Sequence, residues 1–149
     1  LLNLELGADG FWRLASTWCN LGVWNNANSF CVACADLARL LGHAAQLGAS
    51  DEVLDVGVGY GDQVRLWLDE FGVKRVVAVE SSPTVSAAAS ASLADYPAAS
   101  VVHADACKLS STALTSAPSS FDAVLCLDCA YHFSTRASFV ASAVPLLRP

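Results

Sequence analysis

The sequence predicts an α/β protein built on a doubly wound, mostly parallel sheet. Short apolar segments at 52–57, 75–80, 100–103 and 121–127 have the length of buried strands. Segments with helical spacing of apolar residues lie between them, and short loops join the two kinds of segment. Strands that alternate with helices in this way form parallel sheets with right-handed crossovers. We expect the strands, numbered along the chain, to lie in the order 3-2-1-4.

The predicted helices have recognisable ends. Ser82 is placed as an N-cap and Pro83 as a first-turn proline. Gly48 and Gly72 follow the last periodic residues of two other helices, and Pro145 should end the last helix early. The sequence therefore predicts helices over 29–47, 62–71, 82–95 and 134–144.

Composition limits the classes of partner. The 149 residues suit one domain with a hydrophobic core. The net charge is −6 and only 15% of residues are charged, so we expect no nucleic-acid partner, which would need a basic surface. Apolar residues make up 54% of the chain, which suits a sheet covered on both faces. Charged residues and glycines interrupt the apolar stretches, so we expect no integral membrane segment of ~20 residues.

The cysteines include two pairs with C-x-x-C spacing, Cys31/Cys34 and Cys126/Cys129. A zinc site needs a turn that points both thiolates inward. The first pair lies in a helical, Ala-rich stretch and the second in a strand-like one, so we expect no metal and reduced thiols. That favours a cytoplasmic protein. The chain begins at Leu1 and contains no Met, so we expect the natural start, and any targeting segment, to lie upstream.

A glycine-rich turn follows the first predicted strand. Gly57, Gly59 and Gly61 stand at alternate positions, where the backbone can turn tightly and approach a ligand. The dinucleotide fingerprint G-x-G-x-x-G would need a small residue at position 62, but Asp62 would place a carboxylate beside a pyrophosphate. A ligand without phosphate fits better. A nicotinamide-dependent oxidoreductase and a non-catalytic adenosine-binding fragment remain alternatives.

Carboxylates stand at the ends of three other predicted strands. Glu80 ends the second strand, where a carboxylate can accept both hydroxyls of a ribose. Asp105 follows the third and could accept the adenine amino group, and Asp128 follows the fourth. Ligands of open parallel sheets bind outside the carboxyl ends of the strands. The pattern therefore predicts one adenosine-binding site.

These segments resemble a known family. Residues 52–63, 77–80, 104–106 and 121–125 are similar, in order and spacing, to successive motifs of class I S-adenosylmethionine-dependent methyltransferases. Residues 127–133 and 146–149 resemble its small-molecule branch, the kind related to ubiquinone and cyclopropane-fatty-acid methyltransferases. Residues 20–24 resemble the N-terminal cofactor lid of that family.

The resemblance implies an architecture. It divides the chain into a lid over 1–28 and an S-adenosylmethionine-binding, Rossmann-like domain over 29–149. Four of seven strands would be present, with the C-terminal part missing. The fourth strand, 121–127, would then lie at an edge without the Lys or Pro that protects natural edges. We therefore expect residues 1–149 alone to be poorly soluble or self-associated.

The resemblance also implies an activity, methyl transfer from S-adenosylmethionine to a small-molecule acceptor. Such transfer needs alignment and exclusion of water, and a base only where the nucleophile carries a proton. A histidine side chain can serve as such a base, and His132 is the candidate. The implied catalytic residues are His132 and Asp128, and the implied cofactor-binding residues are Asp55, Gly57, Gly59, Gly61, Glu80, Ser81, Asp105, Ala106 and Leu127.

Overall fold

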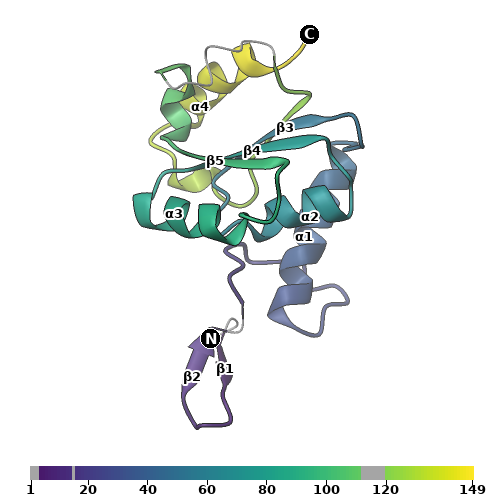
Figure 1. The fold of residues 1–149 in the computed structure, drawn as a ribbon, viewed down its shortest axis with the longest axis vertical. Helices are drawn as coiled ribbons and strands as arrows, with labels where there is room; N and C mark the ends of the chain where they lie inside the picture. Colours follow the sequence, from purple (N-terminus) through teal and green to yellow (C-terminus); the bar gives the residue numbers. More distant parts are fainter. Residues whose placement is uncertain (1–3, 15, 112–119) are drawn as a thin grey trace.

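The computed structural model describes residues 4–14, 16–111 and 120–149 (Figure 1). Its main body is a four-stranded parallel sheet of β3 (Glu52–Val56), β4 (Arg75–Glu80), β5 (Ala99–His103) and β6 (Ala123–Leu125). The strands lie in the order β5-β4-β3-β6. Val53 is paired with Val76 on one side and with Ala123 on the other. This confirms the predicted order 3-2-1-4.

Four helices connect and cover the strands. Ser29, Ser82 and Thr135 are N-caps whose hydroxyls accept backbone N–H groups of the first helical turn. The helices are slightly shorter than predicted, and Pro145 lies in a 3-10 turn beyond the end of the last one, as predicted. The helices are α1 (Phe30–Ala44), α2 (Asp62–Asp69), α3 (Pro83–Ser92) and α4 (Arg136–Ala143), and the 3-10 turns are η1 (Ala106–Ser111), η3 (Ala130–His132) and η4 (Val144–Leu146).

The two faces of the sheet belong to two different hydrophobic clusters. Val53 and Val76 pack with α1 and α2, around the fully buried Trp67. Leu54 and Val77, the next residue on each strand, pack with Leu109 of η1 and with α4 on the opposite face. In Figure 1, α1, α2 and α3 accordingly lie on one side of the sheet and α4 on the other. Successive strand residues point to opposite faces, so each apolar strand is buried on both sides.

The N-terminal residues form a hairpin that the sequence analysis did not predict. β1 (Leu4–Leu6) pairs with β2 (Trp12–Leu14) in antiparallel register. Gly10, in the turn between them, has φ 82°, a left-handed conformation that favours glycine. The hairpin projects from the sheet in Figure 1. The Asp9–Gly10 dipeptide is the turn signal that could have revealed it.

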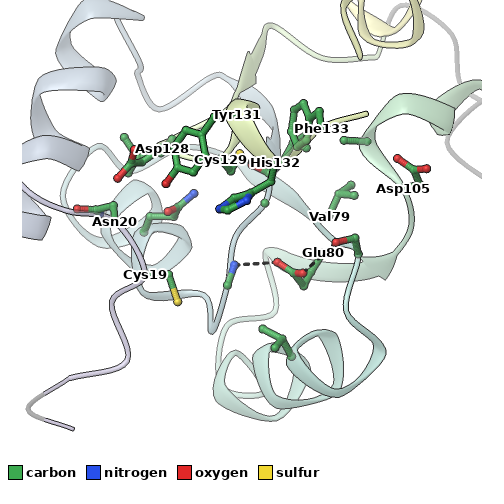
Figure 2. A pocket seen from close by; sticks show the side chains of 18 of the residues that line it. Cys19, Asn20, Val79, Glu80, Asp105, Asp128, Cys129, Tyr131, His132 and Phe133 are labelled. Carbon is green, nitrogen blue, oxygen red and sulfur yellow. Dashed lines mark hydrogen bonds between the residues drawn. The ribbon is translucent and has the colours of Figure 1, made fainter. Parts of the chain in front are cut away.

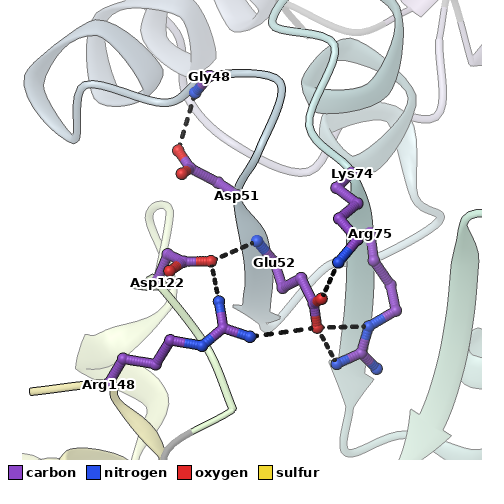
Figure 3. Close-up of polar contacts among 7 residues, drawn as sticks. All are labelled: Gly48, Asp51, Glu52, Lys74, Arg75, Asp122 and Arg148. Carbon is purple, nitrogen blue, oxygen red and sulfur yellow. Dashed lines mark hydrogen bonds and ion pairs between the residues drawn. The ribbon is translucent and has the colours of Figure 1, made fainter.

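An ionic network joins the amino ends of the central strands (Figure 3). Lys74 and Arg75 both donate to Glu52, and these bonds lower the pKa of Glu52 to about 2. Arg148 bonds Asp122 and lies 3.6 Å from Glu52. Phe121 pairs with Leu147 through a parallel bridge rather than extending β6, so β6 is shorter than the predicted strand 121–127. The network lies at the end of the sheet opposite the carboxyl ends of its strands.

Over the ranges that the structure describes, no helix combines the length and the apolar character that crossing a bilayer requires.

Candidate functional site

A cavity of about 720 Å³ lies at the carboxyl ends of all four parallel strands (Figure 2). Val56 and Glu80 reach it from β3 and β4, and Asp105 and Leu127 reach it from the loops after β5 and β6. Cys19, from the N-terminal segment, lies in the wall as well. The cavity has the size of sites that hold small organic ligands or cofactors.

The glycine-rich turn forms the floor of this cavity. Gly57 has φ 74° and Gly59 has φ 57°, and both line the cavity. A Cβ on Gly57 would lie 2.5 Å from Cys129 Sγ, so no side chain fits there. Gly61 is not part of the wall. It is the N-cap of α2 with φ 92°, and a Cβ on it would meet Leu93, so its role is in the turn.

Asp55 lies beneath the cavity rather than in its wall. The side chain is fully buried, and its carboxylate accepts hydrogen bonds from Trp67 Nε1 at 2.7 Å and from Gln63 Nε2 at 3.0 Å. Burial raises the pKa of Asp55 to about 7, against the opposing effect of these two donors. Gln63 does line the cavity, although nothing in the sequence distinguished it. Asp55 therefore holds Gln63, and Gln63 faces the cavity.

Glu80 ties two parts of the wall together. Its carboxylate accepts the Gly59 N–H at 3.1 Å and the Ser82 N–H at 2.9 Å. The Ser81 hydroxyl lies 3.4 Å from the same carboxylate, and Ser81 also lines the cavity. A carboxylate has about four acceptor positions, so Glu80 can accept a ligand hydroxyl while it holds the glycine-rich turn.

Asp105 and Ala106 enter the wall beyond β5. The Asp105 carboxylate accepts the Cys107 N–H at 2.8 Å and lies 3.4 Å from Lys108 Nζ. Its side chain is 48% exposed. Asp105 thus caps η1 and retains an accessible carboxylate oxygen.

The segment after β6 brings together Leu127, Asp128 and His132. Leu127 is almost buried, while Asp128 has φ 51°, which turns the chain back toward the sheet. Asp128 Oδ2 accepts the Leu21 N–H at 2.8 Å. The exposed His132 ring lies 4.4 Å from the Tyr131 ring, centroid to centroid, and Figure 2 shows both at the cavity. Asp128 is therefore bound to the N-terminal segment, and His132 is left open to a ligand.

The N-terminal segment is attached to α1 as well. Asn20 is 4% exposed; its side-chain amide donates to Cys34 O at 3.3 Å, and the Cys34 thiol donates to Asn20 O at 3.1 Å. Val23 N–H donates to Ala33 O at 2.8 Å. Cys19 and Asn20 line the cavity, whereas residues 4–14 form the hairpin. The predicted lid 1–28 therefore contains two structurally different parts.

Comparisons with known proteins agree with this arrangement. The family described as "Methyltransferase domain" matches residues 53–149. Erythromycin 3''-O-methyltransferase of Saccharopolyspora erythraea is 31% identical over 134 residues, which cover 87% of this chain and 42% of that protein.

Solved structures share the fold. The [4+2]-cyclase SpnF superposes with a TM-score of 0.79 at 18% identity, covering 91% of this chain and 50% of SpnF. A methyltransferase from Geobacter sulfurreducens, solved in complex with S-adenosyl-L-homocysteine, superposes with a TM-score of 0.60 at 20% identity, covering 76% of this chain and 44% of that chain. This chain thus spans about half the length of the proteins it matches.

Proposed function

The chain belongs to the methyltransferase domain family, and we propose that its cavity binds S-adenosylmethionine for methyl transfer to a small-molecule acceptor. The observation that carries this proposal is the convergence of all four strand ends on one cavity. Two relatives support it. One is by name an O-methyltransferase for a small molecule, and the other was solved with S-adenosyl-L-homocysteine.

The charge of the wall favours this cofactor over a nicotinamide dinucleotide. Glu80, Asp105 and Asp128 line the cavity, and none of the described lining residues is Lys or Arg. A pyrophosphate would meet three carboxylates and no basic side chain in the described wall, whereas a sulfonium is itself cationic. Bound S-adenosylmethionine supplies an electrophilic methyl group.

The wall residues suit the parts of this cofactor. Gly57 and Gly59 present bare backbone at the cavity, where an added Cβ would meet the sulfurs of Cys129 and Cys19. The Glu80 carboxylate has acceptor positions left for ribose hydroxyls, and Asp105 with Ala106 would border the adenine. Leu127 would then lie near the methyl group.

His132 is the residue that we assign to the acceptor. Its imidazole is exposed at the cavity and can remove the proton from an acceptor hydroxyl. Asp128 acts as a positioning residue, because its carboxylate holds Leu21 and so keeps Cys19 and Asn20 over the cavity. That closure limits water at the reacting groups.

The net charge of −6 favours a small molecule over a nucleic acid as acceptor.

Calorimetry on the full-length protein tests the cofactor assignment. We expect binding of S-adenosyl-L-homocysteine and no heat with NAD. Binding of NAD without any response to S-adenosyl-L-homocysteine would overturn the proposal. Release of S-adenosyl-L-homocysteine that depends on added hydroxylated small molecules would then test methyl transfer itself.

A further inference from the structure

Cys126 and Cys129 form a close thiol pair beside the cavity. Cys126 follows β6, and Asp128, with φ 51°, turns the chain so that Cys129 folds back toward it. The two Sγ atoms are 2.9 Å apart, and both residues are partly buried. A disulfide bond is about 2.05 Å long, so the sulfurs need to approach by less than an ångström to bond.

The environment makes the two thiols unequal. The Cys129 thiol lies in hydrogen-bond contact with Cys126 Sγ, and the backbone N–H groups of Cys129 and Ala130 add to this, so the pKa of Cys126 is lowered. The bond to Cys126 and burial raise the pKa of Cys129. Cys126 is therefore the better source of thiolate, which is the attacking species in thiol–disulfide exchange.

Cys129 also contacts the proposed cofactor site directly. It lines the cavity, and its Sγ lies 3.1 Å from Val56 O. Its sulfur lies 2.5 Å from the position that a Cβ on Gly57 would take, so it packs on the glycine-rich turn. Leu127 and Asp128, between the two cysteines, are wall residues as well. A bond between the sulfurs must shift this segment, because Cys129 gives up its contact with Val56 O.

We propose that Cys126 and Cys129 are a redox-active pair, which a low-molecular-mass disulfide oxidises to an internal disulfide that weakens ligand binding in the cavity. The Cys126 thiolate attacks one sulfur of the oxidant, forming a mixed disulfide and releasing one thiolate. Cys129 then loses its proton, attacks Cys126 Sγ and releases the second thiolate. The protein loses two electrons and two protons, and the oxidant becomes two thiols.

The other pair with the same spacing differs in its setting. Cys31 and Cys34 both lie on α1, and Cys34 is fully buried and bonded to Asn20 O. Burial raises the pKa of Cys34 to about 12. This pair supplies a matched control, since Cys31→Ser changes a cysteine of identical spacing and leaves Cys126 and Cys129 intact.

Mass spectrometry tests bond formation in the full-length protein incubated with oxidised glutathione. We expect the wild type and Cys31→Ser to lose two hydrogens, with the bridge mapped to Cys126 and Cys129 and reversed by a reductant. Cys126→Ser and Cys129→Ser should instead stop at a glutathione adduct or remain unmodified. A glutathione adduct on the wild type without an internal bridge, or a bridge to another cysteine, would overturn the proposal.

Calorimetry with S-adenosyl-L-homocysteine tests the consequence, which rests on the proposed function. We expect affinity to fall by about tenfold on oxidation, within the usual range of coupling between two events on one protein, and to recover with reductant. Equal affinity of the oxidised and reduced forms would overturn the regulatory half. If the bridge forms but neither form binds S-adenosyl-L-homocysteine, the proposed cofactor fails and the thiol pair stands.

Discussion

Two parts of the cavity wall differ in how far apart along the chain their contacts lie. The β3–β4 wall comprises residues 56–59 and 79–82, where Gly57 N–H donates to Val79 O at 2.8 Å and Gly59 N–H to Glu80. The closing wall forms where residues 19–24 meet residues 127–133. Cys19 and Asn20 of the first segment line the cavity, and Leu21 bonds Asp128 across 107 positions of sequence.

The difference indicates a division of roles. The β3–β4 wall continues a pair of hydrogen-bonded strands, so it is as rigid as the sheet. The closing wall depends on two remote segments meeting over the cavity. We expect substitutions in the β3–β4 wall to change cofactor affinity, and substitutions in the closing wall to change turnover or ligand release.

The largest effect is expected at His132. Loss of a general base typically lowers turnover by about 10²–10⁴-fold, so His132→Ala should lower kcat in that range and leave the S-adenosyl-L-homocysteine Kd nearly unchanged. Steady-state kinetics and calorimetry measure the two quantities. His43→Ala, on α1, is the matched control. Loss of affinity with preserved kcat would place His132 on the cofactor side.

Gly57→Ala should be the most damaging change in the β3–β4 wall. The left-handed φ costs a non-glycine residue about 1–2 kcal/mol, and overpacking against Cys129 adds about 1–3 kcal/mol. Thermal unfolding and S-adenosyl-L-homocysteine binding should both weaken. Gly72→Ala has the same kind of backbone, φ 66°, with no atom within 4 Å of the added Cβ, so it isolates the backbone cost. Equal loss of thermal stability in Gly57→Ala and Gly72→Ala would show that the close approach of Cys129 to Gly57 adds no cost.

Glu80→Ala should weaken cofactor binding by about 1.5–3 kcal/mol, the value of hydrogen bonds to a charged acceptor. Calorimetry measures the loss, and Glu80→Gln should be intermediate because it keeps one acceptor oxygen. Glu70→Ala removes an exposed carboxylate that pairs with Arg39 outside the cavity, and should leave affinity unchanged. An unaltered Kd in Glu80→Ala would mean that Glu80 serves only the glycine-rich turn.

Asp128→Asn should have a smaller effect, and it acts on the closing wall. Asn tolerates the left-handed backbone and can still accept the Leu21 N–H. The free energy that holds the two segments together should therefore fall by only about 0.5–1.5 kcal/mol. We expect faster dissociation of S-adenosyl-L-homocysteine and faster proteolysis near residues 16–24, with little change in the association rate. Stopped-flow and limited proteolysis report these rates. If association alone slowed, Asp128 would act on ligand entry rather than on closure.

The smallest effect on binding is expected for Asp55→Asn, but it should alter the pH dependence of stability. An aspartate in an unfolded chain has a pKa of about 4, whereas burial raises the pKa of folded Asp55 to about 7. Between these values the folded state holds a proton that the unfolded state has lost, so the Asp55 contribution to stability falls as pH rises from about 4 to about 7.

Asp55→Asn cannot ionise, so melting temperatures should fall less than in the wild type between pH 5 and 8, and affinity should change less than in Glu80→Ala. Asp95→Asn, an exposed control, should retain the wild-type profile. An unchanged profile in Asp55→Asn would show that Asp55 stays ionised across this range.

Much of the fold was predictable from local patterns. The alternating strands and helices, the caps at Ser82 and Pro83, and the order 3-2-1-4 are confirmed, and so is the resemblance to class I methyltransferases. The N-terminal hairpin and the pairing of Phe121 with Leu147 were not predicted. The two hairpin strands have three residues each and lack the longer apolar run that revealed the fourth strand of the sheet.

The sequence by itself determined which backbone segments reach the cavity. The glycines and carboxylates follow the predicted strands, and parallel topology brings the carboxyl ends of those strands to one edge of the sheet. Tertiary structure decided which further side chains face the cavity and which are turned away from it. It turned Asp55 inward under Trp67 and placed Gln63 in the wall, and it brought Leu21 to Asp128 and Cys126 to Cys129. The contact between Cys126 and Cys129 depends on the left-handed turn at Asp128, and the other contacts depend on the packing of segments far apart in the sequence. Neither a single turn nor long-range packing produces a periodic pattern of residues that the sequence would reveal.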